Sequence, residues 1–286
     1  SGAPEPMSRS PSSGRAWTCS VPDGLRLALT TFTVARLRGP ERLDRRTARA
    51  AMELAPLAGL LLGVSGALVL YAFRVLGDYS APPLLPAALA IGTLALLTRG
   101  LHLDGLADLV DGLGSYRDPE GTRAVMKAPD LGPLGLVAVV VTLLVQVSAL
   151  LSCVQHGRGS ASLVAAVVTG RLAVTWACAG PPAATSEGLG AFVAGTARRS
   201  VAVVWTLVVA GAFAAYATVD GDQLGSDGEQ VVRTVLGVLV GLGRAWLLGR
   251  HAVRRVGGIT GDVLGALSEV ATTGCLVVFA TGVWGS

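Results

Sequence analysis

One apolar stretch decides the fold class of this chain: Leu131-Gly-Pro-Leu-Gly-Leu-Val-Ala-Val-Val-Val-Thr-Leu-Leu-Val-Gln-Val-Ser-Ala-Leu-Leu-Ser-Cys153. It carries no charged side chain over 23 residues. A helix of about 20 apolar residues crosses the roughly 30 Å hydrocarbon core of a bilayer, so the stretch predicts a transmembrane helix. Comparable runs on both sides of it bring the prediction to about seven spans, the other six being residues 52–76, 81–101, 161–180, 201–219, 231–249 and 263–283.

The composition agrees with a membrane protein. Hydrophobic residues make up 51% and charged residues only 15% of the 286 residues, whereas about a quarter of the residues in a soluble domain are charged. The strand-like alternation of an outer-membrane barrel is absent from the sequence, and helices satisfy their own backbone hydrogen bonds inside the bilayer. The predicted fold class is therefore all-α, a polytopic integral membrane helical bundle.

The N-terminal region stands apart from the predicted spans. Residues 1–23 are rich in Ser, Pro and Gly and lack the apolar core of a signal peptide, so we expect a disordered tail. Residues 24–286 would form a single membrane-embedded catalytic domain. Residues 25–34 are apolar but too few to span the bilayer, and a basic stretch follows at residues 36–49. This pattern predicts a short interfacial or half-inserted helix.

The connections between the predicted spans alternate in charge. Basic residues gather in the loops on one face, namely residues 36–49, 99–127, 198–199 and 250–255. A single arginine occurs in the loops on the other face, namely residues 77–80, 155–160 and 220–229. Because positive charge marks the cytoplasmic side, the first face is predicted to be the cytoplasmic face of a multi-pass protein of the bacterial inner (plasma) membrane. The basic residues form no stripe with interleaved aromatic residues, so nucleic-acid binding is not predicted.

An acidic segment follows the second predicted span. Asp104, Asp108 and Asp111 are spaced at i, i+4 and i+7, and at about 100° per residue a helix gathers them within a sector of ~60°. Three carboxylates on one face repel one another unless a cation neutralises them, and Mg²⁺ takes carboxylate and phosphate oxygens as ligands. The spacing predicts an acidic helix at the cytoplasmic face that binds Mg²⁺ and, with it, a pyrophosphate.

Local structure offers an alternative for this segment. Asp104 and Asp111 each precede a glycine, and Asp-Gly pairs are common in turns and helix caps. The apolar residues between the aspartates fall off the acidic face, as in an amphipathic helix, and this pattern favours the metal site. His102, two residues before Asp104, is either a general base or an imidazole at the membrane interface.

Arg171 lies near the middle of the predicted span 161–180, where a charge costs at least ~2.5 to 3.5 kcal/mol on insertion scales. Such a residue usually has a partner. The functional interpretation is that Arg171 faces the interior of the bundle and pairs with a carboxylate or a bound phosphate. The alternatives are a structural ion pair and a displaced span from which the side chain reaches the interface.

Further candidates for phosphate binding lie on the same predicted face. Asp262 follows Gly258 and Thr260 at the start of the last span, where a flexible backbone and helix N-terminal amides favour an anion; the alternative is an N-cap aspartate. Arg117 and Lys127 follow the acidic helix and would neutralise phosphate charge, or they only mark the cytoplasmic side.

Several motifs carry a family resemblance. They are His102-Leu-Asp-Gly-Leu-Ala-Asp-Leu-Val-Asp-Gly112, Gly132-Pro-Leu-Gly135, Glu187-Gly-Leu-Gly190 and Arg255-Val-Gly-Gly-Ile-Thr-Gly-Asp-Val-Leu-Gly-Ala266. In order and spacing they resemble the signature blocks of the cobalamin 5'-phosphate synthase family, also called adenosylcobinamide-GDP ribazoletransferases. The resemblance extends from about Leu25 to the C-terminus. The chain departs from it at Ala183-Ala-Thr185, where family members usually have a Tyr-Ala-Arg-like stretch.

The resemblance implies a function in the last stage of cobalamin (vitamin B12) assembly. It implies transfer of the cobinamide phosphate moiety of adenosylcobinamide-GDP onto α-ribazole or its 5'-phosphate, giving adenosylcobalamin or its 5'-phosphate and GMP. It further implies that the transferase depends on Mg²⁺. Asp104, Asp108 and Asp111 would hold this ion, and the ion would bind the pyrophosphate of adenosylcobinamide-GDP. A homo-oligomer or an association with other cobalamin-assembly enzymes is compatible with it.

Two alternative functions stay open on the sequence alone. A membrane phosphotransferase acting on CDP-alcohols uses related acidic chemistry, but the Ala-Arg pair that follows the first Asp-Gly in those enzymes is missing here. A transporter would place ionisable residues near the midplane, often in repeated halves. Most polar residues of this chain fall at one interface, and Arg171 is the exception.

Overall fold

The structure is a computed structural model that describes residues 20–35, 44–76, 82–219 and 227–281. Twelve helices occupy most of these residues: α1 (Ser20–Phe32), α2 (Arg45–Glu53), α3 (Ala55–Leu76), α4 (Leu84–Leu97), α5 (Leu101–Gly114), α6 (Pro119–Met126), α7 (Pro133–Gln155), α8 (Gly159–Ala177), α9 (Gly188–Val193), α10 (Arg199–Val219), α11 (Asp227–Val256) and α12 (Gly261–Ala280). Within the described ranges, the one strand-like feature is an isolated bridge between Ala183 and Ile259. The predicted all-α fold class is confirmed.

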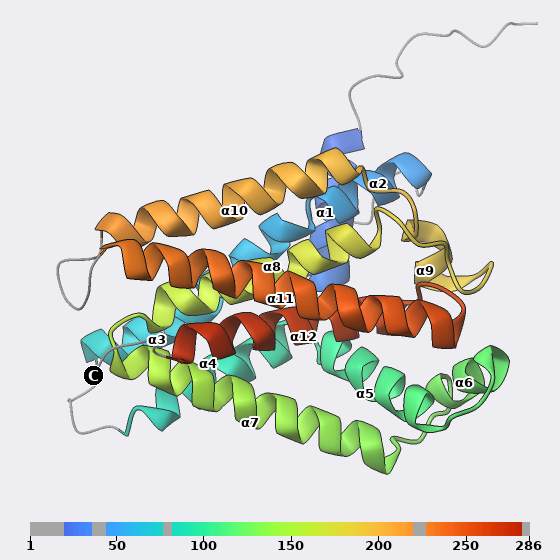
Figure 1. Cartoon of the computed structure of the whole chain (residues 1–286), viewed down its shortest axis with the longest axis horizontal. Coiled ribbons are helices and arrows are strands. Elements are labelled where there is room, and N and C mark those ends of the chain that lie inside the picture. Colours follow the sequence, from blue (N-terminus) through green and yellow to red (C-terminus); the bar gives the residue numbers. More distant parts are fainter. Residues whose placement is uncertain (1–19, 36–43, 77–81, 220–226, 282–286) are drawn as a thin grey trace, which may run out of the picture.

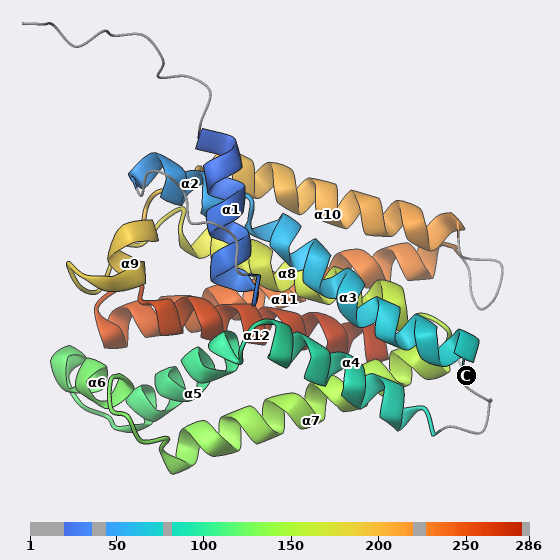
Figure 2. The same cartoon turned by 180° about the vertical axis from the view of Figure 1, so that it is seen from behind.

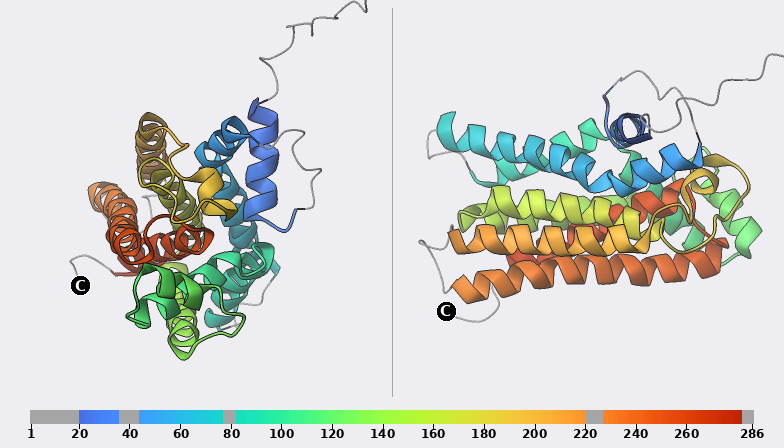
Figure 3. Two further views of the ribbon diagram at one scale, coloured as in Figure 1. Left: turned by 90° about the vertical axis from the view of Figure 1, so that its right-hand side faces the viewer. Right: turned by 90° about the horizontal axis from the view of Figure 1, so that it is seen from above.

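Within the described residues, six helices are long and apolar enough to cross a membrane: α3, α7, α8, α10, α11 and α12. α4 and α5 together would make a seventh span, broken by a bend of 85°. The long helices run side by side along one axis (Figure 1). α1 crosses that axis and is seen end-on in the right-hand view of Figure 3. The helix predicted at residues 25–34 is thus present and lies across the long helices, and its interfacial or half-inserted place in the membrane stays a prediction.

The helix α1 begins at Ser20, inside the segment that we expect to be a tail. Residues 1–19 of that segment lie outside the described residues. The end of α1 is tied to the end of α4, because the N–H of Val34 donates to the carbonyl of Leu97 over 2.7 Å. The polypeptide that precedes the first long span therefore packs against the bundle.

The connections fall at two ends of the bundle. α2, α6, α9 and the α11–α12 connection lie at one end, and the α7–α8 connection lies at the other (Figures 1 and 2). This is the two-faced arrangement predicted from the loop charges. Parts of the predicted loops, including residues 36–43, 77–80 and 220–226, lie outside the described residues. The assignment of one face to the cytoplasm stays a prediction.

The continuous span predicted at residues 81–101 is wrong, because α4 ends and α5 begins within it. Arg99 and Gly100 between them adopt left-handed backbone conformations, with φ of 56° and 69°. The N–H of Gly100 donates to the carbonyl of Ala95 over 2.8 Å, as in the turns that commonly end a helix. The chain therefore leaves α4 in a new direction, and α5 packs against α7 and α12 (Figure 2).

The span predicted at residues 52–76 is divided into α2 and α3, of which only α3 is long enough to cross. Asp44 caps α2 by accepting a hydrogen bond of 2.8 Å from the N–H of Thr47, which lowers the pKa of the Asp44 carboxyl. Glu53 at the end of α2 accepts hydrogen bonds of 2.9 Å from Nε and Nη2 of Arg198. They join α2 to the start of α10 and raise the pKa of the Arg198 guanidinium.

Small residues let α3 and α8 approach each other closely. α3 carries glycines at positions 59 and 63, one turn apart, on the face that meets α8. A Cβ added to Gly59 would lie 3.0 Å from the Cα of Val168, and one added to Gly63 would lie 2.9 Å from the Cα of Val164. Such spacing of small residues is a common way for membrane helices to pack backbone against backbone.

We expect Gly63→Val to destabilise the protein, because its side chain would push α3 away from the backbone of α8. Overpacking of this kind costs about 1–3 kcal/mol. The measurement is the thermal unfolding midpoint of the purified protein in detergent. Gly92→Val on α4 is the matched control, because a Cβ at Gly92 meets nothing within 4 Å. Equal midpoints for the two variants would contradict the packing account.

Candidate active site

The candidate site is built where α5 crosses the start of α12. A Cβ added to Gly105 of α5 would lie 2.8 Å from the Cα of Asp262, and one added to Gly265 of α12 would lie 3.1 Å from the Cα of His102. The backbones of the two helices are therefore in direct contact through a glycine on each side. This contact brings residues about 160 positions apart in the sequence into one place.

Three carboxylates near this crossing influence one another electrostatically. The charges that act on Asp108 are those of Asp104, Asp262 and Asp111, and Asp104 and Lys127 act on Asp262. We call Asp104, Asp108 and Asp262 the acidic cluster. Asp104 is exposed and Asp108 is partly buried. Like charges that act on one another disfavour their ionised forms, so a cation bound beside the cluster would stabilise it.

Asp111, the third predicted metal ligand, has a different environment. Its Oδ2 accepts a hydrogen bond of 2.8 Å from the N–H of Gly132, and its Oδ1 accepts one of 2.8 Å from the N–H of Gly135. These amides belong to the first turn of α7, where backbone N–H groups lack helical partners. Asp111 therefore caps α7 from a neighbouring helix, and the Gly132–Gly135 block forms the socket for its carboxylate.

The metal site predicted from the sequence is not preformed. Among the residues that the structure describes, no three histidine, cysteine, aspartate or glutamate side chains are gathered closely enough to hold a metal ion. The side chains of the acidic cluster would have to turn toward a common point to do so. Mg²⁺ coordination by Asp104, Asp108 and Asp111 thus stays a prediction.

A cavity of about 480 Å³ adjoins the acidic cluster. Its walls come from the ends of α1 and α2, the starts of α5 and α12, the end of α6, and the loop that leads into α9. Four of the predicted site residues line it: His102, Lys127, Thr260 and Asp262. Arg123, Thr185 and Glu187 are the other lining residues with polar side chains that approach from α6 and the loop before α9.

His102 is buried, with an exposed fraction of 2%. Its ring stacks on Phe32 of α1, with ring centroids 5.9 Å apart and an angle of 17° between the planes. Its Nδ1 has no hydrogen-bond partner among the described residues. The imidazole is therefore buried under α1, and one of its nitrogens is left for a ligand or a water. Both interpretations of His102, a general base and an imidazole at the membrane interface, stay predictions.

The start of α12 settles which residue caps this helix. Thr260 is the N-cap, and its Oγ1 accepts a hydrogen bond of 3.2 Å from the N–H of Val263. The alternative interpretation of Asp262 as the N-cap is wrong. Asp262 lies in the first turn instead, where a carboxylate is stabilised by the helix dipole, and its side chain takes part in lining the cavity.

Gly258 contacts protein backbone and does not belong to the cavity lining. Its φ is 157°, and a Cβ there would lie 2.5 Å from the carbonyl carbon of Ala183. Beside it, Ile259 donates its N–H to Pro182 over 2.9 Å, and Ala184 donates to Ile259 over 3.1 Å. The segment that departs from the family pattern thus pairs with the Gly258 segment and brings the loop before α9 to the cavity.

The basic residues after α5 divide into two groups. Lys127 lines the cavity, and so does Arg123, whose Nη1 donates to the carbonyl of Val256 over 2.6 Å and so joins α6 to the end of α11. Arg117 is exposed and outside the lining. Its backbone carbonyl accepts a hydrogen bond of 3.3 Å from Arg255.

Arg171 lies in a separate polar group inside the bundle. Its exposed fraction is 3%, and its Nη1 donates to Oγ of Ser268 over 3.1 Å. Glu269 lines the same small cavity as Arg171 and accepts a hydrogen bond of 2.8 Å from Nε2 of Gln146. Arg171 therefore has polar partners, as expected for a charge in a span, but it does not line the cavity beside the acidic cluster.

Some of the lining residues have no sequence signal. Phe32 belongs to a short apolar helix whose pattern indicates only attachment to the membrane interface. Glu187 lies in a family block, Glu187-Gly-Leu-Gly190, and this block was the available signal. The glycine at position 188 has φ of 85°, which explains a glycine at the turn into α9.

Comparisons with known proteins identify the family. A family model described as cobalamin-5-phosphate synthase matches residues 24–280. A protein of Frankia casuarinae named adenosylcobinamide-GDP ribazoletransferase is 44% identical over 261 residues, which cover 89% of this chain and 93% of that protein. Proteins with the same name from a Nocardioides strain and from Corynebacterium efficiens are 39% and 33% identical, covering 90% and 93% of this chain and 98% and 94% of theirs. No solved structure matches the chain significantly.

The match therefore covers the spans, the acidic helix and the start of α12 together. The relatives cover almost the whole of their own length as well. The chain belongs to the cobalamin-5-phosphate synthase family.

Proposed function

We propose that this chain transfers the cobinamide phosphate moiety of adenosylcobinamide-GDP onto α-ribazole or its 5'-phosphate, giving adenosylcobalamin or its 5'-phosphate and GMP. The family and the names of the relatives supply the substrates. The observation that carries the proposal is that the acidic cluster adjoins a cavity, which Asp262 lines together with Lys127 and Arg123. Carboxylates for a metal beside cations for phosphate are the groups that phosphoryl transfer requires.

In this proposal Asp104, Asp108 and Asp262 hold Mg²⁺. The donor set fits the ion, because the three carboxylates offer hard oxygen ligands and carry more negative charge than Lys127 offsets. Bound Mg²⁺ would stabilise the charge that develops on the pyrophosphate oxygens. Asp111 was predicted as a ligand as well, but both of its oxygens accept hydrogen bonds from α7. We therefore assign it the role of positioning α5 against α7.

The reaction exchanges one phosphorus–oxygen bond for another. The ribose hydroxyl oxygen of α-ribazole attacks the phosphorus atom on the cobinamide side of the pyrophosphate, and the bond from that phosphorus to the GMP oxygen breaks. The hydroxyl proton passes to His102 or to a carboxylate of the acidic cluster acting as general base. Lys127 and Arg123 stabilise the charge on the departing phosphate.

The proposal also gives the site a side of the membrane. The acidic helix α5, α6 and the end of α11 lie at the same end of the bundle (Figure 1), and the last turn of α11 contains Arg254 and Arg255. By the positive-inside tendency this end faces the cytoplasm of the bacterial cell. GMP would then be released where the nucleotide pool is.

We expect Asp108→Asn to abolish most of the activity, because it removes one metal ligand from the acidic cluster. Loss of a ligand or of its charge commonly costs a factor of about 10² or more. The measurement is formation of GMP and of the cobalamin product from adenosylcobinamide-GDP, α-ribazole and Mg²⁺ by the purified protein in lipid nanodiscs.

The control for this experiment is Asp130→Asn, an exposed aspartate in the loop before α7 at the same end of the bundle. It should leave the rate unchanged. Equal activity of Asp108→Asn and wild type would sink the assignment of the metal ligands. Absence of product from folded wild type would sink the proposed reaction itself.

The two roles assigned to aspartates of α5 predict opposite effects on stability. Asp111→Ala should lower the unfolding midpoint, because it leaves two amides of α7 without their partner, at about 1–3 kcal/mol each. Asp108→Asn should leave the midpoint unchanged or raise it in metal-free buffer, because it removes repulsion between carboxylates.

Thermal unfolding of both variants with and without Mg²⁺ is the measurement. A ligand that binds only the folded state raises its stability, so Mg²⁺ should raise the midpoint of wild type and of Asp111→Ala but not that of Asp108→Asn. The reverse pattern would show that Asp111, and not Asp108, holds the ion.

A further inference from the structure

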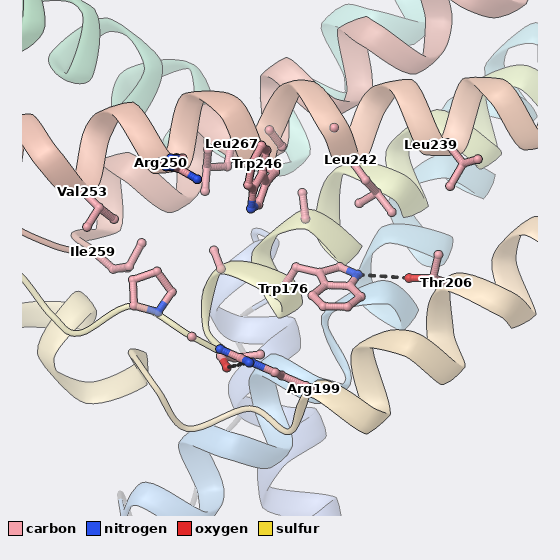
Figure 4. A pocket seen from close by; sticks show the side chains of 18 of the residues that line it. Trp176, Arg199, Thr206, Leu239, Leu242, Trp246, Arg250, Val253, Ile259 and Leu267 are labelled. Carbon is pink, nitrogen blue, oxygen red and sulfur yellow. Dashed lines mark hydrogen bonds between the residues drawn. The ribbon is translucent and has the colours of Figure 1, made fainter.

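A second and larger cavity lies between α8, α10 and α11. Its volume is about 970 Å³, within the range of small-molecule sites. Figure 4 shows its two facing walls, with Leu239, Leu242 and Trp246 on α11 and Trp176 on α8. The one hydroxyl that the figure labels, that of Thr206 on α10, accepts a hydrogen bond of 3.0 Å from Trp176 Nε1. The deep part of the cavity is therefore apolar.

One end of this cavity is strongly basic. Arg199 is the first residue of α10, and Arg250 and Arg254 are one turn apart near the end of α11. All three line the cavity, and the lining residues among the described part of the chain include no aspartate or glutamate. None of the three forms an ion pair with a described residue. Their charges are thus left without a carboxylate partner within the described structure.

The arginines are held in place by other contacts. The guanidinium carbon of Arg250 lies 5.6 Å from the ring centroid of Trp246, a cation–π arrangement. Nε of Arg199 donates to the carbonyl of Ala179 over 3.3 Å. One donor of Arg199 is therefore engaged by the backbone, and the Arg250 guanidinium lies over a tryptophan ring. The other N–H groups of both arginines donate to no acceptor among the described residues and are available to an anion.

This cavity is distinct from the candidate active site. The described linings of the two share no residue. The start of α12 lies between them, with Ile259 and Leu267 on one side and Thr260, Asp262 and Leu264 on the other. A ligand of the apolar cavity would therefore not contact the acidic cluster.

We infer that this cavity binds an anionic glycerophospholipid, with an acyl chain between α8, α10 and α11 and the phosphate at Arg199, Arg250 and Arg254. The polarity changes along the cavity in the order that such a lipid requires, apolar deep in the bundle and cationic at the end of the helices. Only 11% of the apolar part of α10 is buried within the bundle. Most of this helix therefore faces outward, and bilayer lipid has access to the cavity beside it. A nucleotide or an amide-rich corrin would find few hydrogen-bonding groups in the deep part.

The experiment measures which lipid the protein retains. The full chain is purified in mixed micelles that contain equal amounts of phosphatidylglycerol and phosphatidylcholine, and the retained lipids are counted by native mass spectrometry. We expect wild type to retain phosphatidylglycerol in excess. The double change Arg250→Gln and Arg254→Gln should lower this excess by roughly fivefold for each arginine. The control is Arg46→Gln, which alters an exposed arginine of α2 at the same end of the bundle. This variant should show the same excess of phosphatidylglycerol as wild type.

A second pair of variants tests the acyl-chain part. Gly243 lines the cavity, and a Cβ there meets nothing within 4 Å, so Gly243→Leu fills the apolar space without a clash and should lower retention of both lipids. Gly211→Leu on α10 is the control, because Gly211 is outside the lining and equally open. Unfolding midpoints close to that of wild type establish that the variants are folded.

Three results would overturn the inference. One is equal retention of the two lipids by wild type. Another is retention by Gly243→Leu equal to that by Gly211→Leu. The third is complete displacement of phosphatidylglycerol by an equal concentration of sn-glycerol 3-phosphate, which would mean that the arginines bind a free phosphate and that the apolar part contributes nothing.

Discussion

The contact between α5 and α12 is the constraint on which the candidate site depends. Gly105 touches the backbone of Asp262, and Gly265 touches the backbone of His102, so that neither position has room for a side chain without movement of a helix. Because the backbones meet, side chains beside these glycines project around one point and form the acidic cluster and part of the cavity wall. The chemistry that we propose therefore requires glycine, and not a residue with a Cβ atom, at positions 105 and 265.

Two further features hold α5 at this crossing. Arg99 and Gly100, which have left-handed backbone conformations, end α4. The chain bends there by 85°, so α5 does not continue along the axis of α4. At its other end Asp111 accepts hydrogen bonds from the first turn of α7. The acidic helix is thus fixed at both ends and along one face. The basic mouth of the lipid cavity lies on the opposite side of the start of α12, which separates charges that bind phosphate in lipid from those proposed to act on substrate.

The spans and the acidic face could be predicted because each depends on residues close in the sequence: about twenty apolar residues for a span, and a spacing of i, i+4 and i+7 for one helix face. The bend at Arg99 could not, since an arginine and a glycine at the end of an apolar run look the same in a loop and in a broken span. The cap role of Asp111 depends on α7, and the burial of His102 depends on Phe32 of α1. Arg171 was expected to have a polar partner, but only the fold shows that this partner is Ser268 and that Arg171 lies apart from the cavity beside the acidic cluster.

Membership of the family decides between the transferase and the two alternatives left open by the sequence, a CDP-alcohol phosphotransferase and a transporter. We propose that the α5–α12 contact itself creates the metal site of this transferase. Mn²⁺ takes the same oxygen ligands as Mg²⁺, and the electron paramagnetic resonance signal of the free ion measures how much of it is bound. The variant Gly105→Val keeps all three carboxylates but separates the two helices. We expect Mn²⁺ binding to be lost in Gly105→Val and kept in Gly92→Val, whereas Mn²⁺ binding by Gly105→Val with wild-type affinity would show that the metal site does not depend on the contact.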